Sequence, residues 1–339
     1  DMGKELSIRV NIDEAVGTIF ESASEGTLLK AIGNDNLISK PLTTPGVEPS
    51  SANEAVLAGA EDNYGTSYYF RGNVKNNFVN FSGMCFRVVR VQGDGSIKIT
   101  LADRDHECNS SDYSTSLTDS AFISGDSYSY KNNPERKNND FSFNASDALS
   151  YVSSWFYEKG IDEAKTVSSY YCDRVSLTSK KYYDIDRQIV DDITRATYFS
   201  YFFGLNRDDN KYPTLKCDYS TDFYNDNGDL VIYLSYGMLS ADEVVFAGGT
   251  LEQNNSNYYL QDNANDVYWT VSPASLEYIH KEDETGTYET AIIFAVEPSM
   301  FGYIYYDAKA AFIRPVLVLS SEVEITSGDG TQSNPYVVQ

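Results

Sequence analysis

The chain holds few of the side chains that catalysis most often uses. Its 339 residues include two histidines, His106 and His280, and four cysteines. Neither histidine belongs to a nucleophile, zinc or phosphate-binding motif of the G-x-S-x-G, H-E-x-x-H or P-loop kind. We therefore predict that both histidines lie at the surface. We also predict that the protein is not an enzyme and that it needs no cofactor and no metal ion.

Carboxylates are abundant but give weak signals. The 50 Asp and Glu residues make chance pairs common, so a hydrolase that acts on glycans is the least favoured of three functions considered. Segment 225–229, around Asp226, resembles half of a calcium loop because it places Asn and Asp beside a glycine. The first ligand position of that pattern is Phe223, whose side chain has no oxygen. We expect a polar turn there.

Charge and composition exclude several classes of partner. With 26 Lys and Arg against 50 Asp and Glu, the formal net charge is −24 at pH 7. Nucleic acid and anionic lipid both bind clustered cations, so neither is expected as a partner. Hydrophobic residues make up 41% of the chain, enough for a large core, and no apolar run has the length of a membrane helix. We expect no membrane span in these residues and an export signal or anchor outside them.

The four cysteines are widely spaced and even in number, which favours two disulfides. They are Cys85, Cys108, Cys172 and Cys217. Four cysteines allow three connectivities, and the spacing alone does not choose among them. Because disulfides persist in oxidising compartments, we expect an extracellular protein at the cell surface.

Hydrophobic spacing predicts the elements that position these residues. Helices are expected over 12–32, 144–157 and 183–201, and from a capping box that begins at Ser240. Strands are expected over 81–91 and 96–101 around an Asp-Gly turn, then over 267–271, 291–296, 302–306, 312–319 and 323–326. A proline-rich stretch near residue 50 predicts a stiff linker. The predicted domains are therefore 1–50, a helical spacer or docking segment with its linker, and 51–339, a binding domain.

Aromatic and small polar residues interleave from residue 255 onward. The chain has 28 tyrosines, and Tyr combined with Ser, Asn and Gly is typical of adaptable recognition surfaces. This pattern favours the binding of a glycan or a protein. The alternative interpretation is that the rings only cover a twisted sheet.

Several ordered motifs resemble a group of surface proteins of gut Gram-positive bacteria. They are 64–74 (YGTSYYFRGNV), 81–90 (FSGMCFRVVR), 93–98 (GDGSIK), 239–243 (LSADE), 247–249 (AGG), 268–273 (YWTVSP), 313–316 (IRPV) and 327–338 (SGDGTQSNPYVV). The resemblance covers about residues 55–339. The WTVSP and RPV motifs are also similar to the C-type-lectin-like fold of formylglycine-generating enzymes and of retroelement-diversified binding proteins.

This resemblance implies an α+β, C-type-lectin-like domain with short twisted antiparallel sheets and two to three helices. It implies the nearest-neighbour disulfides Cys85–Cys108 and Cys172–Cys217. The enzyme branch uses a reactive cysteine pair late in the fold, and no cysteine follows Cys217 here. The diversified branch places its ligand-binding residues in the last strands and loops, and the matching positions are Tyr278, His280, Tyr288, Phe301, Tyr303 and Tyr305.

The sequence thus predicts an extracellular, adhesin-like protein that binds a glycan or a cell-surface protein through C-terminal aromatic loops. The alternative is a structural subunit of a pilus-like filament that assembles through residues 1–50.

Overall fold

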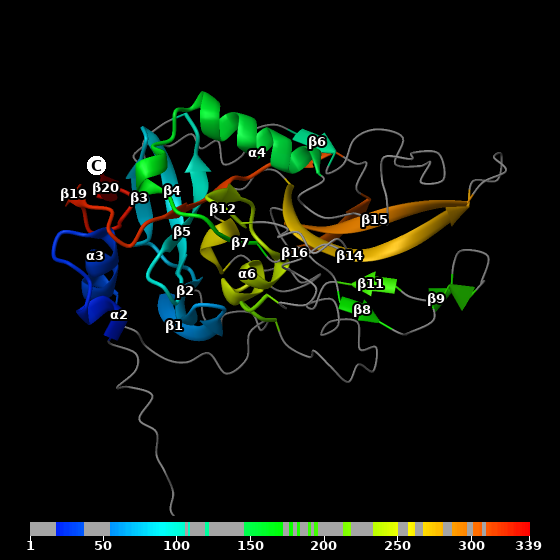
Figure 1. Ribbon diagram of the computed structural model, residues 1–339, viewed down its shortest axis with the longest axis horizontal. Coiled ribbons are helices and arrows are strands. Elements are labelled where there is room, and N and C mark those ends of the chain that lie inside the picture. Colours follow the sequence, from blue (N-terminus) through cyan, green and yellow to red (C-terminus); the bar gives the residue numbers. More distant parts are fainter. Residues whose placement is uncertain are drawn as a thin grey trace, which may run out of the picture.

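The fold is α+β, as the sequence predicts at this coarse level, and its described residues form two large sheets, three two-stranded sheets and a few short helices (Figure 1). The computed structural model describes residues 18–36, 55–105, 108, 119–121, 146–171, 176–178, 182–183, 189–190, 193–195, 213–217, 233–249, 257–261, 267–280, 287–296, 301–306 and 310–339. The N-terminal helices lie at one end of the long axis, and a long β-hairpin reaches the other end (Figure 1).

A nine-stranded sheet is built around the hairpin of β4 and β5, which confirms the strongest local prediction from the sequence. Gln92 and Ser96 close its turn through a backbone hydrogen bond of 2.8 Å, and Gly95 supplies the positive φ of 87° that the turn needs. The strands follow the order β13-β18-β5-β4-β3-β20-β19, and β2 pairs with β4 and with β1. Their bounds are β1 (Ala55–Asp62), β2 (Gly65–Gly72), β3 (Phe78–Phe81), β4 (Met84–Val91), β5 (Ile97–Asp103), β13 (Tyr236–Gly237), β18 (Val316–Leu319), β19 (Ile325–Ser327) and β20 (Tyr336–Val338).

A second sheet of five strands follows the order β16-β15-β14-β17-β6. Its bounds are β6 (Asp119–Ala121), β14 (Tyr268–His280), β15 (Thr287–Val296), β16 (Phe301–Tyr306) and β17 (Ala310–Phe312). The predicted C-terminal strands are confirmed, although β14 and β15 are longer than expected. The run predicted over 312–319 is divided between β17 and β18. Pro315 lies in the break, and proline has no N–H to donate to a strand ladder.

Three short strand pairs complete the β-structure. They are β7 (Ser169–Tyr170) with β12 (Tyr233–Leu234), β8 (Ser176–Thr178) with β11 (Ile193–Arg195), and β9 (Tyr182–Tyr183) with β10 (Ile189–Val190). The prediction of a helix over 183–201 is therefore wrong for the described residues of this region, which form strands. Ile189 and Ile193, two residues of the predicted helical stripe, are β-branched and lie in a two-residue and a three-residue strand.

The helices are short, and two of them begin where the sequence predicts. They are α2 (Thr18–Glu21), α3 (Leu28–Asp35), α4 (Asp147–Glu158) and α6 (Ala241–Phe246), with 3-10 turns η3 (Glu163–Lys165) and η4 (Tyr259–Gln261). Ser146 caps α4 by accepting the N–H of Leu149, and Gly160 follows its end with a φ of 61°. The capping box of α6 is present in full.

The N-terminal helices share the main hydrophobic core with the nine-stranded sheet. Phe20, Leu28, Leu29 and Ile32 are buried in it, and the Leu28 N–H donates to the Val323 carbonyl at 2.9 Å. In the described part of the chain, this segment is thus integrated with the sheet. The linker predicted near residue 50 lies outside the described residues.

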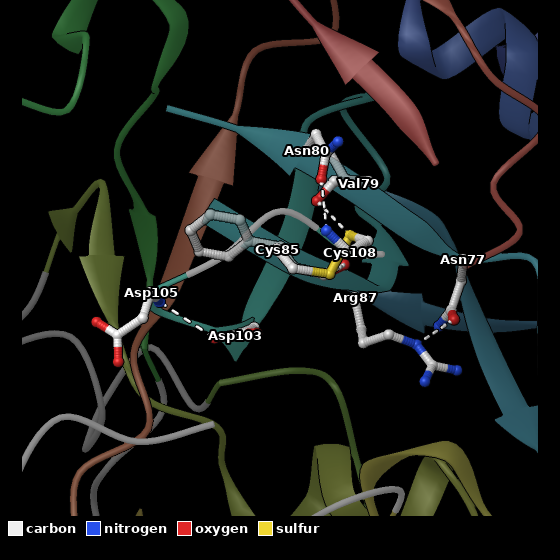
Figure 2. The surroundings of a disulfide bond; sticks show 9 residues. Asn77, Val79, Asn80, Cys85, Arg87, Asp103, Asp105 and Cys108 are labelled. Carbon is white, nitrogen blue, oxygen red and sulfur yellow. Dashed lines mark hydrogen bonds between the residues drawn. A yellow bond between two sulfur atoms is a disulfide. The ribbon is translucent and has the colours of Figure 1, made fainter. Parts of the chain in front are cut away.

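One predicted disulfide, Cys85–Cys108, is confirmed. It joins the start of β4 to the chain after β5, in a small buried cluster with Phe78 and Ala102. Figure 2 shows the Asn80 side chain beside it, accepting the Cys108 N–H at 3.0 Å. Cys217 is also disulfide-bonded. Its predicted partner, Cys172, lies outside the described residues.

Candidate functional site

Four charged side chains from distant parts of the sequence meet inside the protein. The Arg90 guanidinium donates to Asp62 at 2.7 Å and to Glu243 at 3.0 Å, and the Lys98 ammonium donates to Glu243 at 2.6 Å. Each of the four is at most 5% exposed. We call Asp62, Arg90, Lys98 and Glu243 the ion network.

Strand register explains why the ion network needs its carboxylates. Arg90 of β4 lies directly opposite Lys98 of β5. Like charges in that relation repel each other, and burial makes the repulsion stronger. The Oε1 atom of Glu243 accepts from both cations and Asp62 accepts from Arg90, so two carboxylates balance the two positive charges.

The first turn of α6 brings Glu243 to this position. The Glu243 N–H donates to Ser240 Oγ at 3.1 Å, and Glu243 Oε2 accepts the Ser240 N–H at 3.0 Å. One carboxylate therefore caps the helix with one oxygen and binds two cations with the other. This fixes α6 against the β4–β5 hairpin.

Burial and ion pairing have opposite effects on the pKa values here. Burial raises the pKa of Glu243, but the Lys98 ammonium and the Arg90 guanidinium outweigh it and lower that pKa to about 2. Burial lowers the pKa of Lys98, and Glu243 offsets this only in part. Burial also lowers the pKa of Arg90, but Glu243 and Asp62 more than compensate and raise it. Glu243 is therefore ionised at neutral pH, so the network acts as a structural clamp and not as a proton donor.

A pocket, partly open to solvent, lies over the ion network. Arg90, Lys98 and Glu243 line it together with two consecutive tyrosines, Tyr170 and Tyr171. The centre of a water-sized molecule has about 10 Å³ in which to move, which is close to what one water needs. The ion network balances the charges of the lining, and the remaining lining residues combine hydroxyl-bearing and aromatic side chains with the apolar Leu215, Met238 and Val271.

A row of tyrosine rings leads from solvent to this pocket. The Tyr170 and Tyr64 rings are stacked, with centroids 5.8 Å apart and planes 23° apart. On β12, Tyr233 pairs with Tyr170 of β7, and their ring centroids are 4.8 Å apart. Tyr233 is 45% exposed, whereas Tyr64 and Tyr170 are half-buried. We call these three residues the tyrosine row.

Segment 213–217 forms another part of the pocket lining through Thr214 and Leu215. The Thr214 N–H donates to Asp242 of α6 at 3.0 Å. Asn63 accepts the Cys217 N–H at 2.7 Å and donates to the Cys217 carbonyl at 3.0 Å. The disulfide-bonded Cys217 is thus tied to the same turn that supplies Asp62 and Tyr64.

The ligand-binding residues predicted from the sequence lie on the second sheet. Tyr278, His280 and Tyr288 belong to the outer part of the β14–β15 hairpin, where Ile279 is opposite Tyr288. On β16, Tyr303 lies opposite Ala295 and Tyr305 opposite Ile293, and Phe301 pairs with Val296. The pocket lining in the described residues includes none of these six positions. His106 and the calcium-like segment 225–229 lie outside the described ranges.

Sequence reasoning missed the ion network and the tyrosine row as a site. A signal was present: Arg90 and Lys98 lie in strands made mostly of apolar residues, and cations in such strands need buried partners. Glu243 was identified as a helix cap, but its second role depends on contacts 145 and 153 residues away.

The described residues show no sign of a metal site or a membrane-spanning helix. Within the described ranges, His, Cys, Asp and Glu side chains form no group of three suited to a metal ion. No helix there is long and apolar enough to cross a membrane. No protein-family model, curated protein or solved structure matches this chain.

Proposed function

We propose that this chain is an extracellular, adhesin-like binding protein with a C-type-lectin-like domain, and that its tyrosine row binds a glycan. The observation that carries the proposal is the exposed Tyr233 ring, which continues through Tyr170 to a polar pocket. The C–H bonds on one face of a pyranose are weakly positive, and the face of an aromatic ring is negative. A sugar ring can therefore pack on Tyr233 while its hydroxyl groups reach the pocket.

Charge selects a neutral glycan as the ligand. Arg90 and Lys98 line the pocket but are already bound to Glu243 and Asp62, so no cation of the network is left for an acidic sugar. The whole chain carries a net charge of −24, which repels sulfated or sialylated chains at a distance.

Disulfide bonding supports the extracellular part of the proposal. Cys85–Cys108 is closed and Cys217 is also bonded, and such bonds persist where the environment is oxidising. The six C-terminal positions on β14, β15 and β16 remain a second predicted binding surface, and the β14–β15 hairpin extends to the opposite end of the long axis from α2 and α3 (Figure 1).

The test is binding to an array of neutral, sialylated and sulfated glycans, followed by titration of the ligands retained. We expect neutral glycans to be retained, and Tyr233→Ala to weaken their binding about tenfold or more, since exposed aromatic anchors often contribute over 1 kcal/mol. Tyr151→Ala is the matched control, because Tyr151 on α4 has the same 45% exposure. The proposal is contradicted if both variants bind neutral glycans as tightly as the wild-type protein does. It is also contradicted if the array retains acidic glycans only.

A further inference from the structure

The Tyr171 hydroxyl group has no visible role in the fold. Tyr171 is 2% exposed and lines the pocket, and its hydroxyl has no hydrogen-bond partner within the described residues. A phenol hydroxyl that is removed from water normally finds a partner, because leaving it unpaired costs free energy. The hydroxyl therefore points to something that the pocket holds.

The Tyr171 ring is fixed in place by its neighbours. A Cβ atom on Gly237 would overlap the Tyr171 ring, so the glycine is what makes room for it. The Lys98 ammonium lies 4.4 Å from the ring centroid and makes a cation–π contact. The ring is therefore held in the pocket lining, where a small polar molecule in the pocket can reach its hydroxyl group.

The available space sets the size of that partner. About 10 Å³ is free for the centre of a water-sized molecule, which is enough for one water. A buried water needs two to four polar partners. Thr214, Ser240 and Glu243 line the same pocket and supply oxygen atoms.

We propose that Tyr171 holds one ordered water in the empty pocket and that a bound glycan replaces this water with one of its own hydroxyl groups. The second half rests on the proposed function. The ligand is then a neutral sugar that presents one hydroxyl group to the pocket, and a primary hydroxymethyl group, which extends away from the sugar ring, reaches a narrow pocket most readily. A sugar that lacks this oxygen leaves Tyr171 unpaired, and one that carries a carboxylate or acetamido group there exceeds the space of one water.

The water is tested without any glycan. A crystal structure of the full chain at about 1.5 Å resolution should show a water at hydrogen-bond distance from Tyr171 Oη. Tyr171→Phe should not raise the melting temperature. Tyr259→Phe should raise it, because the Tyr259 hydroxyl is buried and unpartnered in the described residues and does not line the pocket. A dry pocket, together with a rise for Tyr171→Phe as large as that for Tyr259→Phe, would overturn the inference.

The exchange of water for a hydroxyl group is tested with methyl glycosides of glucose, galactose and mannose, each paired with its 6-deoxy form. Titrations should show that wild-type protein prefers at least one hydroxymethyl sugar about tenfold over its 6-deoxy form, and that Tyr171→Phe removes this preference. If Tyr171→Phe keeps the preference, the exchange is disproved. If wild-type protein binds no glycan on the array or in titration, the proposed function fails, and the crystallographic and melting results still decide whether Tyr171 holds a water.

Discussion

At the scale of single residues, Glu243 connects two parts of the fold that the sequence separates widely. Its carboxylate caps α6 and also lies between Arg90 and Lys98, which face each other across β4 and β5. Removing its charge leaves two buried cations with Asp62 as the remaining carboxylate of the network. The cost of such a change is dominated by the unpaired charge and not by lost packing.

We expect Glu243→Gln to lower the free energy of unfolding by about 3–5 kcal/mol, the usual effect of breaking a buried ion pair. Urea denaturation followed by circular dichroism measures this. The control is Glu61→Gln, since the Glu61 side chain is 58% exposed and contacts Lys216 at 3.8 Å. An exposed pair of this kind contributes less than about 1 kcal/mol. Equal effects of the two substitutions would show that the ion network does not stabilise the fold.

The same carboxylate predicts how stability changes with acid. The pKa of Glu243 is about 2 in the folded protein, against an ordinary value of 4.5. A lowered pKa means that the contribution is complete above pH 4.5 and is lost as the pH falls toward 2. The difference in unfolding free energy between wild type and Glu243→Gln should therefore be constant above pH 5 and shrink below it. A difference that grows on acidification would contradict this assignment.

At the scale of elements, local signals predicted local structure. The Asp-Gly turn between β4 and β5, the Ser146 cap of α4 and the Ser240 capping box of α6 all depend on residues within a few positions of one another. The short strands β9 and β10 pair with each other and β11 pairs with β8, and helical periodicity along the sequence does not reveal such cross-strand pairing. The pocket was missed for the same reason, because six separate segments line it.

The two cysteine pairs should differ in what they stabilise. Replacing Cys85 and Cys108 by alanine should cost about 3 kcal/mol, because the bond closes a loop with a sequence separation of 23. Their cluster is apart from the pocket lining, so glycan affinity of the folded protein should not change. Replacing Cys172 and Cys217 by alanine should weaken glycan binding, because Cys217 holds the segment that carries Thr214 and Leu215.

Calorimetry and glycan titration of both double variants test this pair of expectations. The expectation is wrong if replacing Cys85 and Cys108 weakens glycan binding while replacing Cys172 and Cys217 does not.

At the scale of the whole molecule, the first helices and the last strands form one body with the central sheet. Ile32 of α3 is fully buried in the main core, and Thr27 pairs with Glu324 near β19. We expect Ile32→Ala to lower the free energy of unfolding by about 2–5 kcal/mol, as for other large core side chains. Glu25→Ala, at an 84% exposed side chain, is the control and should have little effect. If the N-terminal helices were instead a separate spacer, Ile32→Ala would not change the free energy at which the sheet unfolds.

The C-terminal strands β19 and β20 lie beside α3, at the same end of the long axis (Figure 1). The Tyr336 hydroxyl donates to Asp35 at 2.9 Å, and Figure 1 shows the C-terminal end beside β19 and β20, near α3. A mechanical load applied across the two ends would be carried first by the contact between α3 and the last strands. The segments around the pocket would then keep their structure until the contact between α3 and the last strands had broken.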